Sequence, residues 1–398
     1  MERIESKGSS NHLKLEHTIK HNPVVQKLYR CVMSVAFQLL GKFIRIDDTL
    51  VLMNGHGYKY NDSPRAIYRK MCELGLDKKY HIVWALNDPD DTVILGGVEK
   101  IKMDTFQYFK IALKAKYWIS CVGIERGLHF KKKNQIYLNT WHGAAINVSG
   151  NGVPGRNDFH WGYIDYFCMC GRLDEINFGR DMELNPKSYL RCGYPRNDML
   201  SNVSLELQKE IRTKLRLPEG KKFVLYAPTW RDSQDGGDSF QLAPPIDWNK
   251  WREKLGDKYI VLLRTHPYTT KLMNMKFNDF VLDFTSYLEV NDLLIAADIL
   301  ISDYSSILLD YCITEKPMIC FGYDIEEYTR VRGGFYYDLN KEMPNGVMRN
   351  EDQIIEHLLS LDYEIECEKT MLFKRNHCEY EKGHATIDCI NTVFGTNY

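Results

Sequence analysis

Hydroxyl groups are concentrated in the short segment Ser302-Asp303-Tyr304-Ser305-Ser306. Apolar residues 299–301 before it predict a buried strand, and residues 305–312 resume with helical spacing, so the segment lies where a strand becomes a helix. The first turn of a helix has free N–H groups and a partial positive charge, to which serine hydroxyls add donors. The segment therefore predicts a phosphate site, although an ordinary serine cap is the alternative for these five residues alone.

A histidine follows another predicted strand. Residues 135–140 read as a strand, and His142 comes directly after it, ahead of a loop rich in glycine. A histidine at the carboxyl end of a strand is well placed to take a proton from a substrate, because its pKa lies near neutrality. Taken alone, such a histidine is more often structural than catalytic.

Two further predicted strands end in cationic or hydroxyl side chains. Thr229 and Arg231 follow the strand predicted at 223–227, and Arg264 and His266 follow the one at 259–263. A guanidinium group can pair with two phosphate oxygens at once, so these residues suit a diphosphate. A surface ion pair is the alternative for each residue, but three strand ends of one sheet carry such groups.

The elements that position these residues alternate between strands and helices, which predicts parallel α/β sheets. At 398 residues the chain exceeds what a single core usually serves. We expect an N-terminal α/β domain over residues 48–200 and a second over 201–398 that ends in helices. Two such domains facing each other would form a cleft at the carboxyl ends of their strands.

The composition limits which binding partners and which cellular compartment are expected. A net charge of -1 gives no indication of a nucleic-acid partner. The eleven cysteines include no CxxC pair, so we expect a reduced, cytosolic protein with cysteines as small core residues and no cleavable signal peptide. Asp247 and Asp283 stand apart from other acids, so no metal site and no permanently bound cofactor is expected.

Residues 1–47 form a polar start followed by an amphipathic helix. Apolar residues recur at helical spacing from Val24 to Phe43, and residues 1–44 hold seven Lys and Arg against three Glu. The pattern is too interrupted to span a bilayer. A helix lying on an anionic membrane surface and a helix packed on the body of the protein are equally compatible with it.

Five motifs in this order resemble those of the CDP-glycerol glycerophosphotransferases, which include teichoic acid primases and polymerases and related capsule polymerases. Together the motifs span about residues 50–375, and the set is specific where any one would be weak. They are Asn139-Thr140-Trp141-His142-Gly143, Tyr226-Ala227-Pro228-Thr229-Trp230-Arg231, Arg264-Thr265-His266-Pro267, Ser302-Asp303-Tyr304-Ser305-Ser306, and residues 324–338.

The resemblance implies a GT-B architecture and the transfer of an alditol phosphate from a CDP-alditol to an acceptor hydroxyl, with release of CMP. It implies that His142 is the general base and that His266, the second catalytic residue, lies by the donor phosphates. Gly143 and Asn147 would lie on the acceptor side. The donor-binding residues it implies are Thr229, Arg231, Arg264, Ser302, Asp303, Ser305 and Ser306.

The same resemblance implies a lipid-linked saccharide or polymer acceptor at the cytoplasmic face of the membrane. Independently of the resemblance, a diphosphate donor can bring Mg²⁺ with it. One departure concerns the acceptor: Ala144-Ala145-Ile146-Asn147 lacks the positive charge that often follows this motif in the family. A CDP-ribitol donor, a GT-B glycosyltransferase that uses a nucleotide sugar, and an inactive binding subunit stay open as alternatives.

Overall fold

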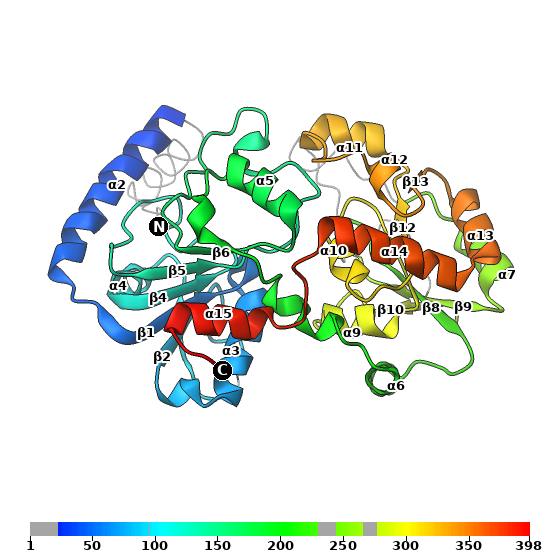
Figure 1. Cartoon of the computed structure of the whole chain (residues 1–398), viewed down its shortest axis with the longest axis horizontal. Coiled ribbons are helices and arrows are strands. Elements are labelled where there is room, and N and C mark those ends of the chain that lie inside the picture. Colours follow the sequence, from blue (N-terminus) through cyan, green and yellow to red (C-terminus); the bar gives the residue numbers. More distant parts are fainter. Residues whose placement is uncertain (1–22, 95, 230–243, 266–276) are drawn as a thin grey trace, which may run out of the picture. The chain divides into compact units, whose positions relative to one another are not determined.

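The computed structural model describes residues 23–94, 96–229, 244–265 and 277–398 (Figure 1). It separates into two compact units, Met1–Asn139 and Thr140–Tyr398. Both contain parallel strands and helices, so the predicted α/β class is confirmed. The domain boundaries predicted near residues 47 and 200 stay predictions.

The strands of the first unit run in the order β3-β2-β1-β4-β5, and all neighbours are parallel. The central strand β1 is buried along residues 50–53, as its unbroken apolar run requires. The strands are β1 (Asp47–Asn54), β2 (His81–Leu86), β3 (Glu99–Lys102), β4 (Ala115–Ser120) and β5 (Ile136–Asn139). The helices are α2 (Pro23–Phe43), α3 (Asp62–Glu73) and α4 (Phe106–Lys114), with short 3₁₀ turns at His56–Tyr58 and Leu76–Lys78.

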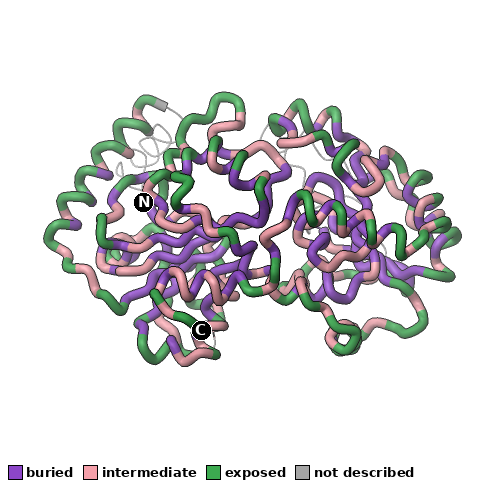
Figure 2. Tube along the Cα trace, viewed as in Figure 1, coloured by how far each residue is buried: buried purple, intermediate pink, exposed green. Residues whose placement is uncertain are grey.

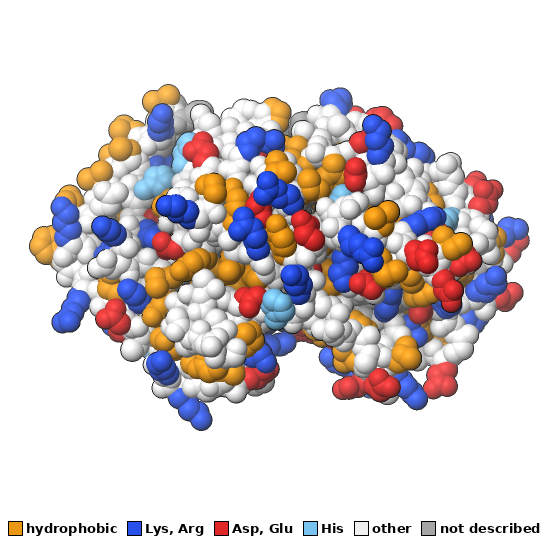
Figure 3. All heavy atoms as spheres, viewed as in Figure 1, with side chains coloured by type: hydrophobic (Ala, Val, Ile, Leu, Met, Phe, Trp, Pro, Cys, Tyr) orange, Lys and Arg blue, Asp and Glu red, His pale blue; other side chains and the backbone are white. Residues whose placement is uncertain are grey.

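Helix α2 packs on its own unit through one face. Phe37 stacks on Phe109 with ring centroids 4.6 Å apart, and the hydroxyl of Ser34 accepts a hydrogen bond from the His129 N–H. The other face carries apolar side chains, spaced three or four residues apart, that are all exposed: Val24, Leu28, Val32, Val35, Leu39 and Phe43. We call these six residues the α2 stripe. Hydrophobic side chains are visible along the edge of the view where Figure 1 draws α2 (Figure 3).

The second unit contains a parallel sheet in the order β10-β9-β8-β11-β12-β13, and a parallel pair formed by β6 (Tyr166–Cys168) and β7 (Tyr189–Leu190). Strands β8, β9 and β11 are buried almost throughout (Figure 2). The strands of the larger sheet are β8 (Lys222–Tyr226), β9 (Tyr259–Leu263), β10 (Val281–Asp283), β11 (Ile299–Ser302), β12 (Met318–Phe321) and β13 (Val347–Met348).

The helices of the second unit follow its strands and complete the alternation. In chain order they are α5 (Arg172–Asp181), α6 (Leu205–Lys214), α7 (Trp248–Leu255), α9 (Val290–Ala296), α10 (Ile307–Cys312), α11 (Ile325–Arg332), α12 (Leu339–Glu342), α13 (Glu351–Ser360), α14 (Tyr363–His377) and α15 (Ala385–Phe394). Short 3₁₀ turns lie at Gly150–Gly152, Pro186–Ser188 and Pro195–Leu200. Among the described residues, every helix is too short or too polar to traverse a bilayer.

Candidate functional site

His142 follows a residue with an unusual backbone. Trp141 has a positive φ of 52°, a conformation that costs a non-glycine residue about 1–3 kcal/mol and persists only where the surroundings enforce it. The indole of Trp141 lies 5.5 Å from the Trp161 ring and 5.9 Å from the Phe178 ring, centroid to centroid. These contacts hold Trp141 in place and thereby fix the direction in which the chain enters His142.

The residues after His142 are anchored on a buried carboxylate. Asp174, in the first turn of α5, accepts hydrogen bonds from the N–H groups of Ala145 (2.8 Å) and Cys170 (3.0 Å) and from the Tyr194 hydroxyl (2.6 Å). Burial raises the pKa of Asp174. The Tyr194 oxygen also lies 3.5 Å from the Gly143 carbonyl oxygen. Asp174 therefore holds the loop that carries His142.

The same loop touches the serine turn at the start of α10. A Cβ atom placed on Gly143 would lie 2.6 Å from Oγ and 3.0 Å from Cβ of Ser306, and 3.8 Å from Nη2 of Arg196. A non-bonded carbon cannot approach that closely, so only glycine allows the loop and the turn to meet here. The structure thus brings together Gly143 and Ser306, which lie far apart in the sequence.

Hydrogen bonds to main-chain carbonyls join the loop to neighbouring segments of the second unit. The Asn147 side-chain amide donates to the Tyr304 carbonyl (2.8 Å), inside the serine segment. The Val148 N–H donates to the Gly334 carbonyl (3.1 Å), and the Tyr336 N–H donates to the Ile146 carbonyl (3.0 Å). Asn147, predicted on the acceptor side, is thus placed where it connects the histidine loop with the serine turn.

Three of the predicted donor-binding residues hold the ends of β8 and β11 together. Ser302 is fully buried, and its hydroxyl donates to the Ala227 carbonyl (2.6 Å). The buried carboxylate of Asp303 accepts hydrogen bonds from the Thr229 N–H (2.9 Å), the Thr229 hydroxyl (2.5 Å) and the Tyr304 N–H (2.7 Å). The structure therefore brings Thr229 and Asp303 together, and these contacts shape the turn.

The next two serines are more accessible. Ser305 and Ser306 are both partly exposed, and the Ser305 hydroxyl accepts a hydrogen bond from the Ile307 N–H (3.3 Å). Ser306 occupies the cap position of α10, where its side chain makes no capping hydrogen bond. Within the serine segment, Ser305 and Ser306 are therefore the two residues that are partly exposed to solvent.

Arg264 follows β9, as predicted, and is half-buried. Its Nη2 donates to the Tyr287 carbonyl over a long 3.5 Å, and its Nε is buried without a hydrogen-bond partner. Burial lowers the pKa of its guanidinium group. No carboxylate within the described ranges pairs with it, so an incoming anion would satisfy a donor that is otherwise left without a partner.

Two predicted site residues, Arg231 and His266, lie outside the described residues. Their placement stays a prediction from the motifs that contain them. Strand β8 ends at Tyr226, the first residue of its motif, and β9 ends at Leu263, just before the other motif.

Arg196 was not predicted, although it lies against Gly143. Its Nη2 donates to both carboxylate oxygens of Asp310 in α10 (3.0 and 2.9 Å), and the Asn197 side-chain amide donates to the same carboxylate (2.8 Å). Arg196 follows shortly after β7, in Gly193-Tyr194-Pro195-Arg196. The strand-end pattern that identified Arg264 would have identified Arg196 as well.

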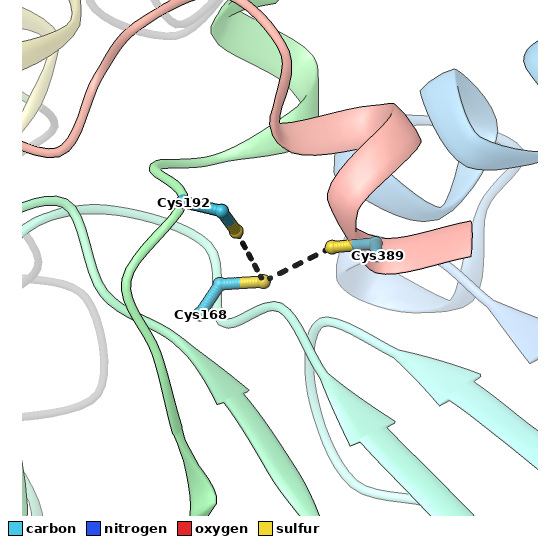
Figure 4. Close-up of side chains that lie close together, drawn as sticks. All are labelled: Cys168, Cys192 and Cys389. Atoms are coloured by element: carbon cyan, nitrogen blue, oxygen red, sulfur yellow. Dashed lines mark hydrogen bonds between the residues drawn. The ribbon is translucent and has the colours of Figure 1, made fainter. Parts of the chain in front are cut away.

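Three buried cysteines form the one group of His, Cys, Asp or Glu with metal-ligand spacing among the described residues (Figure 4). The Sγ atom of Cys168 lies 3.5 Å from that of Cys389 and 4.0 Å from that of Cys192. Burial raises the pKa of Cys168 and Cys389, so both are neutral thiols that pack as small core residues. Among the described residues, no group of three or more carboxylates lies within ligand spacing of one another.

The fold is GT-B-like, and within its second unit a histidine loop meets a serine turn. Residues 36–395 match the family described as CDP-Glycerol:Poly(glycerophosphate) glycerophosphotransferase, and the chain belongs to this family. The resemblance carried by the five motifs is thereby confirmed.

The named relatives are teichoic acid polymerases and transferases. The chain is 32% identical over 365 residues to the teichoic acid poly(glycerol phosphate) polymerase of Staphylococcus epidermidis, which covers 85% of this chain but 49% of that protein, about half its length. It is 28% identical over 389 residues to the teichoic acid glycerol-phosphate transferase of Staphylococcus aureus, covering 93% of this chain and 98% of that protein.

A solved structure supports the fold. The wall teichoic acid polymerase TagF, as a histidine-to-asparagine variant soaked with CDPG, superposes with a TM-score of 0.78 at 28% sequence identity. The match covers 94% of this chain and 96% of that one.

Proposed function

We propose that this protein transfers glycerol phosphate from CDP-glycerol to a hydroxyl group of a lipid-linked acceptor, in the synthesis of a teichoic acid or capsule-type polymer. The observation that carries the proposal is the contact between Gly143 and Ser306, since it places the histidine loop beside the turn expected to hold phosphate. Family membership and the CDPG-soaked relative support the choice of donor.

The reaction is an in-line displacement at phosphorus. An acceptor hydroxyl oxygen attacks the phosphorus atom that bears glycerol, the bond from that phosphorus to the oxygen of CMP breaks, and CMP leaves. The products are a phosphodiester and CMP. The protein must orient the hydroxyl group, accept its proton and stabilise the charge on the phosphate oxygens.

We assign His142 as the base that accepts the proton of the acceptor hydroxyl group. It directly follows the anchored Trp141 and precedes the loop that Asp174 holds, so the chain on both sides of it is fixed. A histidine is a suitable base because its ordinary pKa lies near neutrality. Gly143 allows this loop to approach the donor's phosphates.

The phosphates are assigned to residues at three places in the second unit. Ser305 and Ser306 supply hydroxyl donors at the start of α10, and Arg264 supplies a guanidinium group whose Nε has no partner. Thr229, Ser302 and Asp303 shape this turn through their mutual contacts. Arg231 and His266 are assigned to the donor by the family resemblance, and Mg²⁺ would enter with the diphosphate donor.

Donor turnover tests the proposal. The protein would be incubated separately with CDP-glycerol, CDP-ribitol and a UDP-sugar, each with a lipid-linked acceptor, and the release of CMP or UDP would be measured. We expect release of CMP from CDP-glycerol, inhibited by CMP far better than by UMP, because a pocket that satisfies the cytosine amine rejects a base with an acceptor there. Turnover of CDP-ribitol alone would establish the ribitol alternative. Turnover of the UDP-sugar would establish a glycosyltransferase, and no turnover of any donor would favour a binding subunit.

We also propose that the protein acts at the cytoplasmic face of the membrane and docks there through the α2 stripe. The two alternatives left open for this helix are compatible, since α2 packs through Ser34 and Phe37 and exposes a separate apolar face. An exposed row of six large apolar side chains is expected at an interaction surface rather than at a free one.

A further inference from the structure

An open cavity lies at the carboxyl end of α2 in the first unit. It has a volume of about 460 Å³ and is lined by Gly41, Ile44, Arg45, Lys116 and Lys132 among others. That volume lies in the range of about 300–1,000 Å³ typical of small-ligand pockets. No residue of the cavity belongs to the proposed catalytic site, which lies wholly in the second unit.

The cavity is cationic and the cations are not neutralised. Arg45, Lys116 and Lys132 face a single carboxylate among the lining residues, that of the exposed Asp48. No ion pair joins these three cations to a carboxylate in the described part of the chain. The adjacent Asp47 is already engaged, since its carboxylate lies 3.1 Å from the Lys114 ammonium. The lining therefore carries an excess of positive charge.

The two lysines are held in place by main-chain carbonyls. Lys132 donates to the Ile44 carbonyl (2.6 Å), and Lys116 donates to the Asn134 carbonyl (2.6 Å). Lys132 is half-buried, and burial lowers its pKa. An ammonium group that is partly withdrawn from water and lacks a counter-ion gains most from an anion placed beside it.

The position of the cavity indicates which kind of anion it binds. Gly41 belongs to α2, and Ile44 and Arg45 follow it directly, so the cavity begins where the α2 stripe ends. The last residue of the stripe, Phe43, is 88% exposed. An apolar row that leads into a cationic pocket matches the two parts of a phospholipid, whose acyl chains adjoin a charged phosphate.

We propose that this cavity binds the headgroup phosphate of an anionic phospholipid, with Arg45, Lys116 and Lys132 as its ligands. Bound lipid would fix the carboxyl end of α2 at the depth of the headgroups while the stripe enters the apolar layer. The inference rests on the membrane docking proposed for α2. The inference adds a specific binding site for a lipid headgroup to the docking surface proposed on α2.

Vesicle binding by the full chain tests the site. The double variant Arg45→Gln and Lys116→Gln removes two of the three cations and leaves Lys132 and its bond to Ile44 in place. A matched control, Lys59→Gln with Lys78→Gln, removes two exposed cations of the same unit that do not line the cavity. Affinity would be measured for vesicles of phosphatidylcholine alone and with phosphatidylglycerol, after the melting temperatures of all variants are shown to match that of the wild type.

We expect the cavity variant to bind phosphatidylglycerol vesicles at least about tenfold more weakly, since each cation near an anionic surface contributes about a fivefold factor. The control should lose less than about threefold. Equal losses in the two variants, or no loss in the cavity variant, would overturn the proposal. Binding of inorganic phosphate at the cavity without any preference for anionic vesicles would overturn the lipid assignment.

A third variant separates this inference from the docking proposal. Val32→Glu with Leu39→Glu alters the stripe and leaves the cavity intact. If this variant binds anionic vesicles as the wild type does while the cavity variant does not, docking through the α2 stripe is wrong and the phosphate site in the cavity is supported. If the stripe variant is released from anionic vesicles and the cavity variant is not, docking through the α2 stripe is supported and the phosphate site in the cavity is wrong.

Discussion

The smallest residue of the site makes one of its closest contacts. Gly143 follows the proposed base and lies so close to Ser306 that a Cβ atom would clash there, so the loop that carries the proposed base meets the serine turn directly. Asp303 and Ser302 have a structural role, because their polar groups already form hydrogen bonds within the turn. The residues that shape the site and those free to touch substrate are thus distinct, which single-residue changes can test.

Replacing His142 with Ala should lower turnover by about 10²–10⁴-fold, the usual contribution of a general base, with little change in donor affinity. Turnover would be followed by CMP release and donor affinity by calorimetry. His384→Ala is the control, since that histidine is exposed and pairs with Asp388. Turnover near that of the wild type would remove His142 from the mechanism.

Gly143→Ala should push the loop from the serine turn, because the new methyl group would lie 2.6 Å from the Ser306 hydroxyl oxygen. A displacement of about 1 Å costs on the order of 10²-fold in rate, so kcat/KM should fall by about that factor. Ser306→Gly removes both clashing atoms together with a hydroxyl group assigned to the donor, so the double variant is compared with Ser306→Gly alone. In that background Gly143→Ala should cost much less than it does in the wild type.

Gly123→Ala is the matched control, since nothing lies within 4 Å of a Cβ atom there. If Gly143→Ala costs as much in the Ser306→Gly background as in the wild type, the contact between loop and turn is not what limits the rate.

At the scale of elements, helix α2 has two apolar faces with different roles. Phe37 and Gly41 are buried on the face that packs, whereas Val32 and Leu39 are 57% and 51% exposed. The sequence pattern predicted an amphipathic helix but could not separate the faces, because both are apolar. Removal of the whole helix would therefore disturb the core of the first unit, and substitutions on the stripe are the better test.

Placing Glu at Val32 and Leu39 should release the protein from anionic vesicles while turnover of a water-soluble acceptor is retained, since charge is costly in an apolar layer and harmless in water. Co-sedimentation and CMP release would be measured together. Should the variant aggregate or unfold instead, the stripe is part of a core and the docking proposal is wrong.

The start of α5 provides a second test at this scale. Asp174→Asn keeps the shape of the side chain but replaces one acceptor oxygen with a donor that faces an N–H group. The loop should shift, and kcat should fall by on the order of 10-fold to 10²-fold at an unchanged donor KM. Asp158→Asn at the surface is the control, and a loss of thermal stability without a change in kcat would limit Asp174 to a folding role.

For the whole molecule, the order of elements could be predicted closely from the sequence. Strand β9 has the predicted ends, and β8 ends one residue before its predicted end, since the buried apolar runs are clear there. Sequence patterning does not reveal β3 or β13, because three of the four residues of β3 are charged and β13 has only two residues. Asp174 was not predicted as a site residue, because a buried acid at a helix start looks like any acid in a first turn.

One buried histidine should affect the stability of the whole molecule. His377, at the end of α14, is buried against Phe373 and Tyr337, and burial lowers its pKa to about 4. The Glu342 carboxylate, 3.5 Å away, does not offset this. Since the unfolded chain takes up the proton near pH 6.5 and the folded one only near pH 4, stability should fall as the pH drops through that window.

The expected loss from His377 between pH 7 and pH 5 is about 2 kcal/mol. Urea unfolding at the two pH values would measure it, and His377→Phe should lose this part of the pH dependence whatever its effect on stability at pH 7. An unchanged slope in His377→Phe would show that the residue is not neutral in the folded protein.

The segment from Gly143 to Ser149 has consequences for how the family can diversify. It is fixed at Ala145 by Asp174, at Asn147 by the Tyr304 carbonyl and at Val148 by Gly334. With successive residues bonded to different neighbours, an inserted or deleted residue would break several bonds at once. New acceptor preferences should therefore arise through insertions in other loops, and this segment should keep its length while its side chains change.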